Sequence, residues 1–319
     1  MKKDKQRSAL PFLVVAMAII AAVFAFGPTA FDNNTNAKNM TPYRAERFVL
    51  PDMRVVENVL PKLFKNPSGS SGSKETATVK INLRNDTNFD IDVQQLLDKG
   101  VRVPLNEEGV QVVIVHTHGT EAYTPHGSDT YKESDELRTL DQTQNVLRVG
   151  EELKNALQEQ GIKTVHCTEL CDYPQYNSAY DRSREVIEKM LRMYPEAQIV
   201  LDLHRDAVAT ADGGYYKATA QIDGIDAAQL LFVVGTDGGG LNHPDWRDNM
   251  SFQLRLHERI EQMYPGLMRP INVRAARFNQ HFRTGSMLLE VGTCANYLQE
   301  ALYSVRLFAD ALADVLKNG

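Results

Sequence analysis

The feature that most constrains this chain is a set of three short apolar runs, each of which ends in histidine or carboxylate side chains. The runs are VVIVHTHGTE (residues 112–121), IVLDLHRD (residues 199–206) and MLLEVG (residues 287–292). Short runs rich in β-branched residues are typical of parallel strands buried between helices. Because ligands gather beyond the carboxyl ends of such strands, the sequence predicts an α/β fold with His and Glu side chains at one edge of the sheet.

Segments with helical spacing alternate with segments typical of strands. Apolar side chains recur at helical spacing in residues 142–158, 182–193, 251–263 and 298–316. Short apolar stretches predict strands at residues 111–115, 162–166, 198–203, 230–235 and 287–291. This alternation predicts a three-layer α/β domain with a mostly parallel central sheet.

The N-terminal end of the sequence is typical of a membrane anchor. A basic segment, residues 1–8, precedes the uncharged residues 9–30, and the apolar part of that stretch is close to the roughly 20 residues that a spanning helix needs. Because basic residues stay on the cytoplasmic side, we expect a cytoplasmic N-terminus, an uncleaved transmembrane helix and an exported remainder. A cleaved signal peptide is the alternative, but the apolar run is long for one.

Composition divides the rest of the chain into a stalk and a domain. Residues 31–75 are polar in their first part and contain a Gly/Ser linker, NPSGSSGS, near their end. We therefore expect a compact extracytoplasmic domain over residues 76–319. The formal net charge is −6 without an extended basic patch, which argues against a nucleic-acid partner. Cys167 and Cys171 are close enough in sequence to pair, or they remain free thiols.

The polar residues after the first two runs have the types that a hydrolytic zinc site requires. Such a site has three protein ligands and an open position for water. His118 and Glu121 flank a tight turn after the first run, and His204 ends the second. His116 precedes the turn, so we expect only one of the two histidines to reach the metal, and we prefer His118. Asp141 is an alternative carboxylate ligand, or the cap of the following helix.

Other residues are candidates for catalysis and substrate binding. Glu290 ends the third run, where a carboxylate could take a proton from water and return it to a leaving amine; a pair with an internal arginine is the alternative. Arg205 and Arg283 are candidates for binding a substrate carboxylate or an oxyanion. We expect Trp246 to lie in a loop after the Gly-rich residues 235–240, where it could stack on a sugar or peptide.

Several of these motifs together resemble one known family. The segments HTHGTEAY (residues 116–123), DLHRDA (residues 202–207) and LEVG (residues 289–292), with Asn296, resemble the stage II sporulation protein P family. That family is related to the zinc-dependent N-acetylmuramoyl-L-alanine amidases. The resemblance implies an amidase-like fold of the phosphorylase/hydrolase type and one zinc ion. It assigns the zinc ligands to His118, Glu121 or Asp141, and His204, the catalytic role to Glu290 and substrate binding to Asn296.

The resemblance also implies a biological role. It implies a peptidoglycan hydrolase that cuts the amide between the muramic lactyl group and L-alanine, with peptide cross-links as a further target. Such proteins act in forespore engulfment, in the intermembrane space of the sporulating cell. Their partners are a lytic transglycosylase, stage II sporulation protein D, and a membrane protein, stage II sporulation protein M.

Two other functions fit the same residues. The spacing from His118 to Glu121 is also found in zinc carboxypeptidases, so a peptidase of exported proteins is a second hypothesis. A fixed Arg205 that clamps a terminal carboxylate would favour it. A non-catalytic, wall-binding scaffold is the third hypothesis, which failure to bind zinc would support.

Overall fold

The computed structural model describes residues 79–105, 108–125, 137–211 and 213–318. The expected cytoplasmic segment, the anchor, and the stalk with its linker all lie outside these residues, so their assignments remain predictions. Among the described residues, no helix combines the length and the apolar character needed to cross a membrane.

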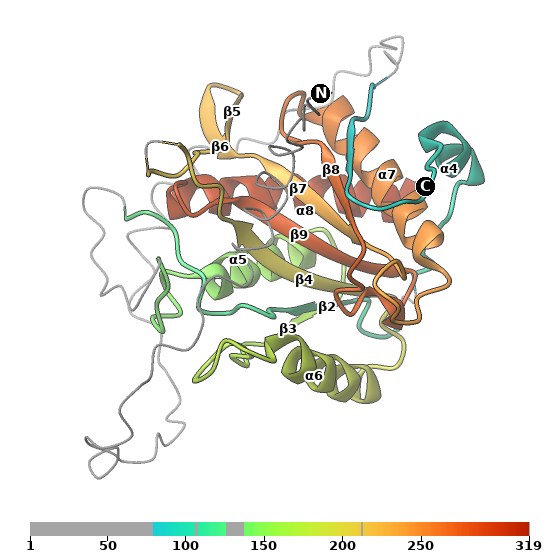
Figure 1. The fold of residues 1–319 in the computed structure, drawn as a ribbon, viewed down its shortest axis with the longest axis horizontal. Coiled ribbons are helices and arrows are strands. Elements are labelled where there is room, and N and C mark those ends of the chain that lie inside the picture. Colours follow the sequence, from blue (N-terminus) through green and yellow to red (C-terminus); the bar gives the residue numbers. More distant parts are fainter. Residues whose placement is uncertain (1–78, 106–107, 126–136, 212, 319) are drawn as a thin grey trace, which may run out of the picture. The chain divides into compact units, whose positions relative to one another are not determined.

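A mixed, mostly parallel sheet forms the centre of the described domain. Its strands lie in the order β1–β8–β7–β9–β4–β2–β3 (Figure 1). Their bounds are β1 Leu83–Asn85, β2 Val112–Val115, β3 Thr164–His166, β4 Ile199–Asp206, β7 Leu230–Gly235, β8 Ile271–Arg274 and β9 Gly285–Thr293. A separate hairpin consists of β5 (Thr219–Ile222) and β6 (Ile225–Ala228).

One strand pair in the sheet, β7 with β9, is antiparallel. The chain reaches β7 from β4 through the β5–β6 hairpin, whereas β2–β3, β3–β4 and β7–β8 are each joined by a helix. Two parallel strands that follow each other in the chain need a long crossover, usually a helix. In the described part of the chain no helix lies between β4 and β7, and β7 runs antiparallel to β9. The prediction of a mostly parallel α/β sheet is therefore confirmed, with this one reversal.

Helices cover both faces of the sheet. They are α4 Val93–Lys99, α5 Val146–Glu159, α6 Ala179–Met193, α7 Trp246–Met263, α8 Leu298–Asn318 and the 3-10 turn η1 Gln280–Phe282. Helix α6 packs Val186 and Ile187 against Val113 and Val200 on one face. On the other face α8 places Phe308 against Phe232 of β7. Helices α5 and α7 pack against α8.

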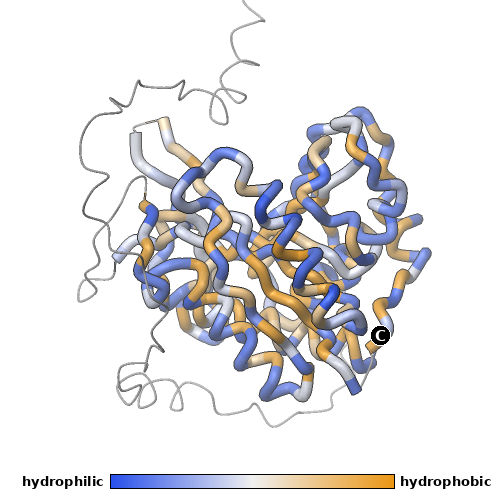
Figure 2. The backbone as a smooth tube through the Cα atoms, turned by 90° about the horizontal axis from the view of Figure 1, so that it is seen from below, coloured by the Kyte–Doolittle hydropathy of each residue, from blue (hydrophilic) through white to orange (hydrophobic). Residues whose placement is uncertain are grey.

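The core follows the hydropathy of the sequence. Hydrophobic segments run through the middle of the described domain and hydrophilic ones gather at its periphery (Figure 2). All four residues of β2 are buried, as expected for a strand between two helical layers. Cys167 and Cys171 are free thiols, so the possible disulfide is not formed.

Two helix starts differ from the prediction. Helix α5 begins at Val146 rather than at residue 142, because Asn145 is its cap and accepts a hydrogen bond from the backbone of Leu147. Asp141 instead accepts from Thr143 in a separate turn. Helix α7 begins at Trp246, five residues before the predicted start at residue 251. The short strands β1 and β8, the helix α4 and the β5–β6 hairpin were not predicted, since they lack a long apolar pattern.

Candidate active site

Three of the predicted metal ligands lie together where β2 and β4 end. The rings of His118 and His204 are 5.4 Å apart between centroids, at 77° to each other. Nδ1 of His204 lies 3.5 Å from Oε2 of Glu121. All three side chains are buried, and His118 keeps 8% of its surface exposed. Neighbouring parallel strands and the tight turn after β2 thus bring together residues that are more than eighty positions apart in the sequence.

Asp202 fixes the position of His204 from two residues earlier on β4. One carboxylate oxygen lies 2.9 Å from Nε2 of His204, and the two oxygens accept hydrogen bonds from the backbone N–H and hydroxyl of Thr117 at 2.8 and 2.6 Å. Burial opposes a charge on His204, but the carboxylates of Asp202 and Glu121 outweigh it and raise the pKa of His204 well above its ordinary value. The ring is therefore held between two acids in its protonated form, and it would release a proton on binding a metal.

Glu121 is held in its ionised form. Its Oε2 accepts a hydrogen bond from the backbone N–H of Arg205 at 3.2 Å, and Oε1 lies 3.5 Å from Nη2 of Arg138. Burial opposes ionisation, but the hydrogen bond with His204 and the charge of Arg205 lower the pKa of Glu121 far below its usual range. A carboxylate in this state is a suitable ligand for a cation.

The loop before α6 and the first turn of α6 cover His118. Tyr176 stacks on its ring at 4.6 Å between centroids and 7° between planes, and Tyr180 contacts its edge at 5.7 Å. Burial lowers the pKa of His118 to about 4, so the ring is neutral at neutral pH. Neutral imidazole is the form that binds metals.

The donor types at this site fit a zinc ion. Two imidazoles and a carboxylate are ordinary zinc ligands. Nδ1 of His118 is buried without a hydrogen-bond partner among the described residues, and such an atom is costly unless another partner binds it. Among the described residues, however, no three His, Cys, Asp or Glu side chains already form a group arranged to hold a metal.

The ring of His116 forms hydrogen bonds with residues outside this cluster. Its Nδ1 donates to the carbonyl of Leu203 at 2.8 Å, and its Nε2 lies 2.8 Å from Nε2 of His166. Burial and then the charge of His166 lower its pKa to about 3, so it is neutral and its Nε2 accepts from His166. Both nitrogens are used, and His118 rather than His116 lies beside His204 and Glu121.

Glu290 lies one strand away, on the same face of the sheet. It is paired in register with His204 on β4 and with Leu231 on β7. Its side chain lines a cavity of about 200 Å³, and its Oε2 has no hydrogen-bond partner. Desolvation raises its pKa to about 8. The alternative prediction was that Glu290 pairs with an internal arginine. Among the described residues, however, no ion pair involves Glu290.

The predicted substrate-binding roles of Trp246 and Arg283 are not supported by their positions. The prediction that Trp246 lies in a loop is wrong: it begins α7, is 1% exposed and packs 5.1 Å from Phe89. Arg283 precedes β9 and donates to the carbonyls of Ala197 and Phe282. Because Ala197 lies just before β4, Arg283 is at the opposite strand ends from His204.

Arg205, Asn296 and Asp141 also have other tasks. The guanidinium of Arg205 donates to the carbonyls of Ala122 and Leu137, so it holds the turn after β2. Asn296 is fully buried and accepts from the backbone of Thr293. Asp141 is exposed, in the turn before α5. The structure does not bring these three side chains to the site as free ligands for a substrate or metal.

Some residues of the site were missed in the sequence. Asp202 had a signal, because a polar residue two positions before His204 on an apolar strand must share its face. Tyr176, Asp172 and Arg138 had none, since they come from loops. Arg138 donates to Asp172 at 2.8 Å and lies over the Tyr176 ring at 4.8 Å.

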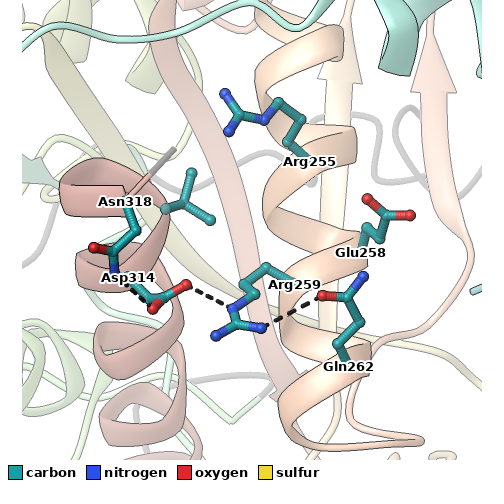
Figure 3. A pocket seen from close by; sticks show the side chains of 7 residues that line it. Arg255, Glu258, Arg259, Gln262, Asp314 and Asn318 are labelled. Atoms are coloured by element: carbon teal, nitrogen blue, oxygen red, sulfur yellow. Dashed lines mark hydrogen bonds and ion pairs between the residues drawn. The ribbon is translucent and has the colours of Figure 1, made fainter. Parts of the chain in front are cut away.

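A separate pocket lies between α7 and α8 (Figure 3). Its volume is about 230 Å³, and it is on the side of the sheet where α8 packs. Arg259 pairs there with Asp314 at 2.6 Å, and Asp314 also accepts from Asn318. These charges satisfy one another, so the pocket has no evident link to the His–Glu cluster.

Comparisons with known proteins point to one family. The sequence model of the family "Stage II sporulation protein P (SpoIIP)" matches residues 35–313. The chain is 30% identical over 215 residues to Stage II sporulation protein P of Bacillus subtilis (strain 168), which covers 64% of this chain and 50% of that relative. The chain thus spans about half the length of the curated relative that it matches.

Solved structures with a distant likeness were also found. N-acetylmuramoyl-L-alanine amidase AmiC2 of Nostoc punctiforme has a TM-score of 0.37 and 12% identity, over 66% of this chain and 97% of that one. The N-acetylmuramoyl-L-alanine amidase from Clostridium difficile 630 has a TM-score of 0.38 and 14% identity, over 66% and 96%. Likeness at this level does not establish a shared fold or activity.

Proposed function

This chain belongs to the stage II sporulation protein P family, and we propose that it is a zinc-dependent peptidoglycan hydrolase with an amidase-like catalytic domain. The bond that it cleaves is the amide between the muramic lactyl group and L-alanine, with peptide cross-links as a second target. The observation that carries the proposal is the meeting of His118, Glu121 and His204 beside Glu290 on one face of the sheet.

His118, Glu121 and His204 would hold one zinc ion. Bound zinc makes a water molecule more acidic and polarises a carbonyl oxygen. The chain's own contribution is to hold these ligands in place: Asp202 and the Thr117 hydroxyl position the ring of His204, and the backbone of Arg205 positions the Glu121 carboxylate. Tyr176 covers one face of His118 and excludes water from it.

Glu290 is the proposed general base and acid. Its unpartnered Oε2 borders an open cavity, where it can accept a proton from the attacking water. The same oxygen then returns the proton to the nitrogen of the leaving L-alanine. A carboxyl group suits both steps, because the amine must be protonated before it can leave.

The biological setting is part of the same proposal. Residues 9–30 anchor the chain in the membrane with the catalytic domain outside, in the intermembrane space of the sporulating cell. The chain acts there in engulfment with a lytic transglycosylase and a membrane protein, stage II sporulation proteins D and M.

The peptidase hypothesis has less support from the site. The feature that would favour it is a fixed Arg205 that clamps a terminal carboxylate. The Arg205 guanidinium instead donates to the carbonyls of Ala122 and Leu137, so it would have to leave both to bind a substrate.

Digestion of purified peptidoglycan by the full chain tests the proposed reaction. Mass spectrometry of the soluble products is expected to show free stem peptides that begin with L-alanine, which disappear with a chelator and return with zinc. Products with split cross-links and an intact lactyl–alanine bond would instead indicate a peptidase. The Glu290→Gln variant is the matched control, since it keeps the proposed zinc ligands and is expected to release no stem peptides.

A further inference from the structure

A second and larger cavity adjoins the one that contains Glu290. Its volume is about 590 Å³, and its walls come from α6, from the loop after β7 and from residues 275–279 after β8. Tyr180 and Phe278 line both cavities. The two cavities therefore meet at this aromatic pair, and a ligand in the larger one can extend toward Glu290.

Two arginines that form no ion pair with any described residue lie in the wall of the larger cavity. The Nε atoms of Arg184 and Arg277 are both buried without a hydrogen-bond partner, and Arg277 donates through Nη1 to the carbonyl of Asn242 at 3.2 Å. Both side chains line the same cavity, and burial and then the positive charge of Arg184 lower the pKa of Arg277. Asp181 lines the same cavity, yet in the described part of the chain no ion pair joins it to either arginine.

This arrangement favours a bound anion. Two cations that line one cavity repel each other, and buried donors cost free energy unless they are paired. An anion between the guanidinium groups would remove both costs. Carboxylates match the planar fork of arginine particularly well, because they accept two parallel hydrogen bonds.

The backbone at the junction is held in an unusual conformation. Phe278 and Asn279 have φ angles of +48° and +54°, in the left-handed region that bulky residues rarely adopt. Asn279 donates to the carbonyl of Tyr180 at 2.8 Å and to the Ser183 hydroxyl at 3.1 Å. These bonds hold the loop on α6 and keep the Phe278 ring 5.6 Å from that of Tyr180.

The junction is also connected to the candidate metal ligands. The hydroxyl of Ser183, which binds Asn279, lies 2.8 Å from the hydroxyl of Thr117. Thr117 in turn binds Asp202, the partner of His204. One chain of hydrogen bonds therefore fixes the junction and His204 relative to each other. Strain that is held by such bonds is typical of functional positions.

We propose that the larger cavity is a substrate subsite that binds a free carboxylate of the stem peptide through Arg184 and Arg277. The inference rests on the proposed function, since it takes the peptide part of peptidoglycan as the ligand. Apolar side chains also line the cavity, among them Leu241 and Phe278. They suit the aliphatic part of a peptide better than inorganic phosphate, which carries no apolar surface beside its charge.

Binding to the catalytically impaired full chain tests the subsite without turnover. The probe is a soluble stem tetrapeptide with free carboxylates, titrated calorimetrically into the Glu290→Gln protein. Arg184→Gln and Arg277→Gln, each added to that protein, are expected to weaken binding about tenfold or more, as for the loss of a charged hydrogen bond. Arg184→Lys is expected to recover part of the affinity.

Controls separate this effect from loss of folding or of general charge. Arg192→Gln removes the same charge from an exposed position on α6 and is expected to leave binding unchanged. The same tetrapeptide with amidated carboxylates is expected to bind the parent protein as weakly as the free peptide binds the Arg184 variant. Thermal unfolding of each variant checks that it is folded.

The outcomes distinguish this inference from the proposed function. If the wild-type chain releases no stem peptides but peptide binding depends on both arginines, the subsite stands and the hydrolase proposal fails. Unchanged peptide affinity in both arginine variants, or tighter binding of inorganic phosphate than of the peptide, would overturn the subsite. With an active wild type, the arginine variants are expected to raise KM and leave kcat nearly unchanged.

Discussion

Asp202 is the residue that links the two strands with the candidate ligands. It contacts His204 on its own strand and binds Thr117 on β2. Residues that orient a metal-binding histidine commonly change metal affinity by about ten- to a hundredfold when they are replaced. Asp202→Asn is therefore expected to lower zinc affinity by about tenfold or more, measured by competition with a chelator of known affinity.

Asp141 provides the control for that measurement. It is exposed, and among the described residues its side chain bonds only within a local turn, so Asp141→Asn is expected to keep the wild-type zinc affinity. Zinc loss in Asp141→Asn together with full affinity in Asp202→Asn would contradict the site and restore Asp141 as the ligand.

His257 on α7 gives a pH-dependent stability that is independent of the site. Burial alone lowers its pKa from 6.5 to about 4, because the charged form is not solvated there. Between these values the unfolded chain binds more protons than the folded one, so the free energy of unfolding falls as pH falls from 6.5 to 4. At about 1.4 kcal/mol per pKa unit, the contribution is about 3 kcal/mol.

Chemical denaturation at several pH values measures this effect. The difference in unfolding free energy between pH 7 and pH 4.5 is expected to be smaller in His257→Gln than in the wild type. An equal difference in both proteins would show that His257 is not held neutral by the fold.

At the residue scale, the sequence predicted which residues form the His–Glu cluster better than it predicted the hydrogen-bond partners of the residues around it. His118, Glu121 and His204 meet as strand order and turn length suggested. The tasks of Arg205 and Asn296 could not be predicted, because their partners are backbone carbonyls or side chains in loops. A residue type indicates what an atom can bind, but only the fold decides what reaches it.

At the scale of elements, α5 contains a glycine with a defined task. A Cβ atom at Gly150 would lie 2.6 Å from Nε2 of both His116 and His166, closer than carbon and nitrogen can approach. Alanine would gain about 1 kcal/mol of helix propensity, but it would force the histidine pair apart. Gly150→Ala is therefore expected to destabilise the protein by about 1–3 kcal/mol, as overpacking does.

Asn155→Ala on the same helix is the matched control. Asn155 is partly exposed and lies on α5, so alanine is expected to stabilise the chain slightly through helix propensity. Urea denaturation compares the two variants. If Gly150→Ala proved as stable as Asn155→Ala, the close packing of the His116–His166 pair would not be as described.

Long amphipathic elements were predictable, and short ones were not. The strand β7 was predicted with its observed ends, and α6 and α8 within three residues. The start of α5 was misplaced because the cap is Asn145, whereas Asp141 has the same cap chemistry in a nearby turn. Strand β8 joins the sheet by pairing with β7, and β1 by pairing with β8, which no local pattern reveals.

At the scale of the whole molecule, the described domain places its candidate chemistry on one face of the sheet. His204 on β4 and Glu290 on β9 are paired there, and the arginine cavity lies beside them. The sequence predicted that the ends of three strands would meet. It did not predict the arginine cavity, because Arg184 and Arg277 come from a helix and a loop almost a hundred positions apart.

The zinc content of five full-length proteins tests the central claim most directly. Atomic spectroscopy is expected to find one zinc per chain in the wild type and in Glu290→Gln, and much less in His118→Ala, Glu121→Gln and His204→Ala. A wild type without zinc under zinc-replete conditions, or full zinc in Glu121→Gln or in either histidine variant, would contradict the proposed metal centre.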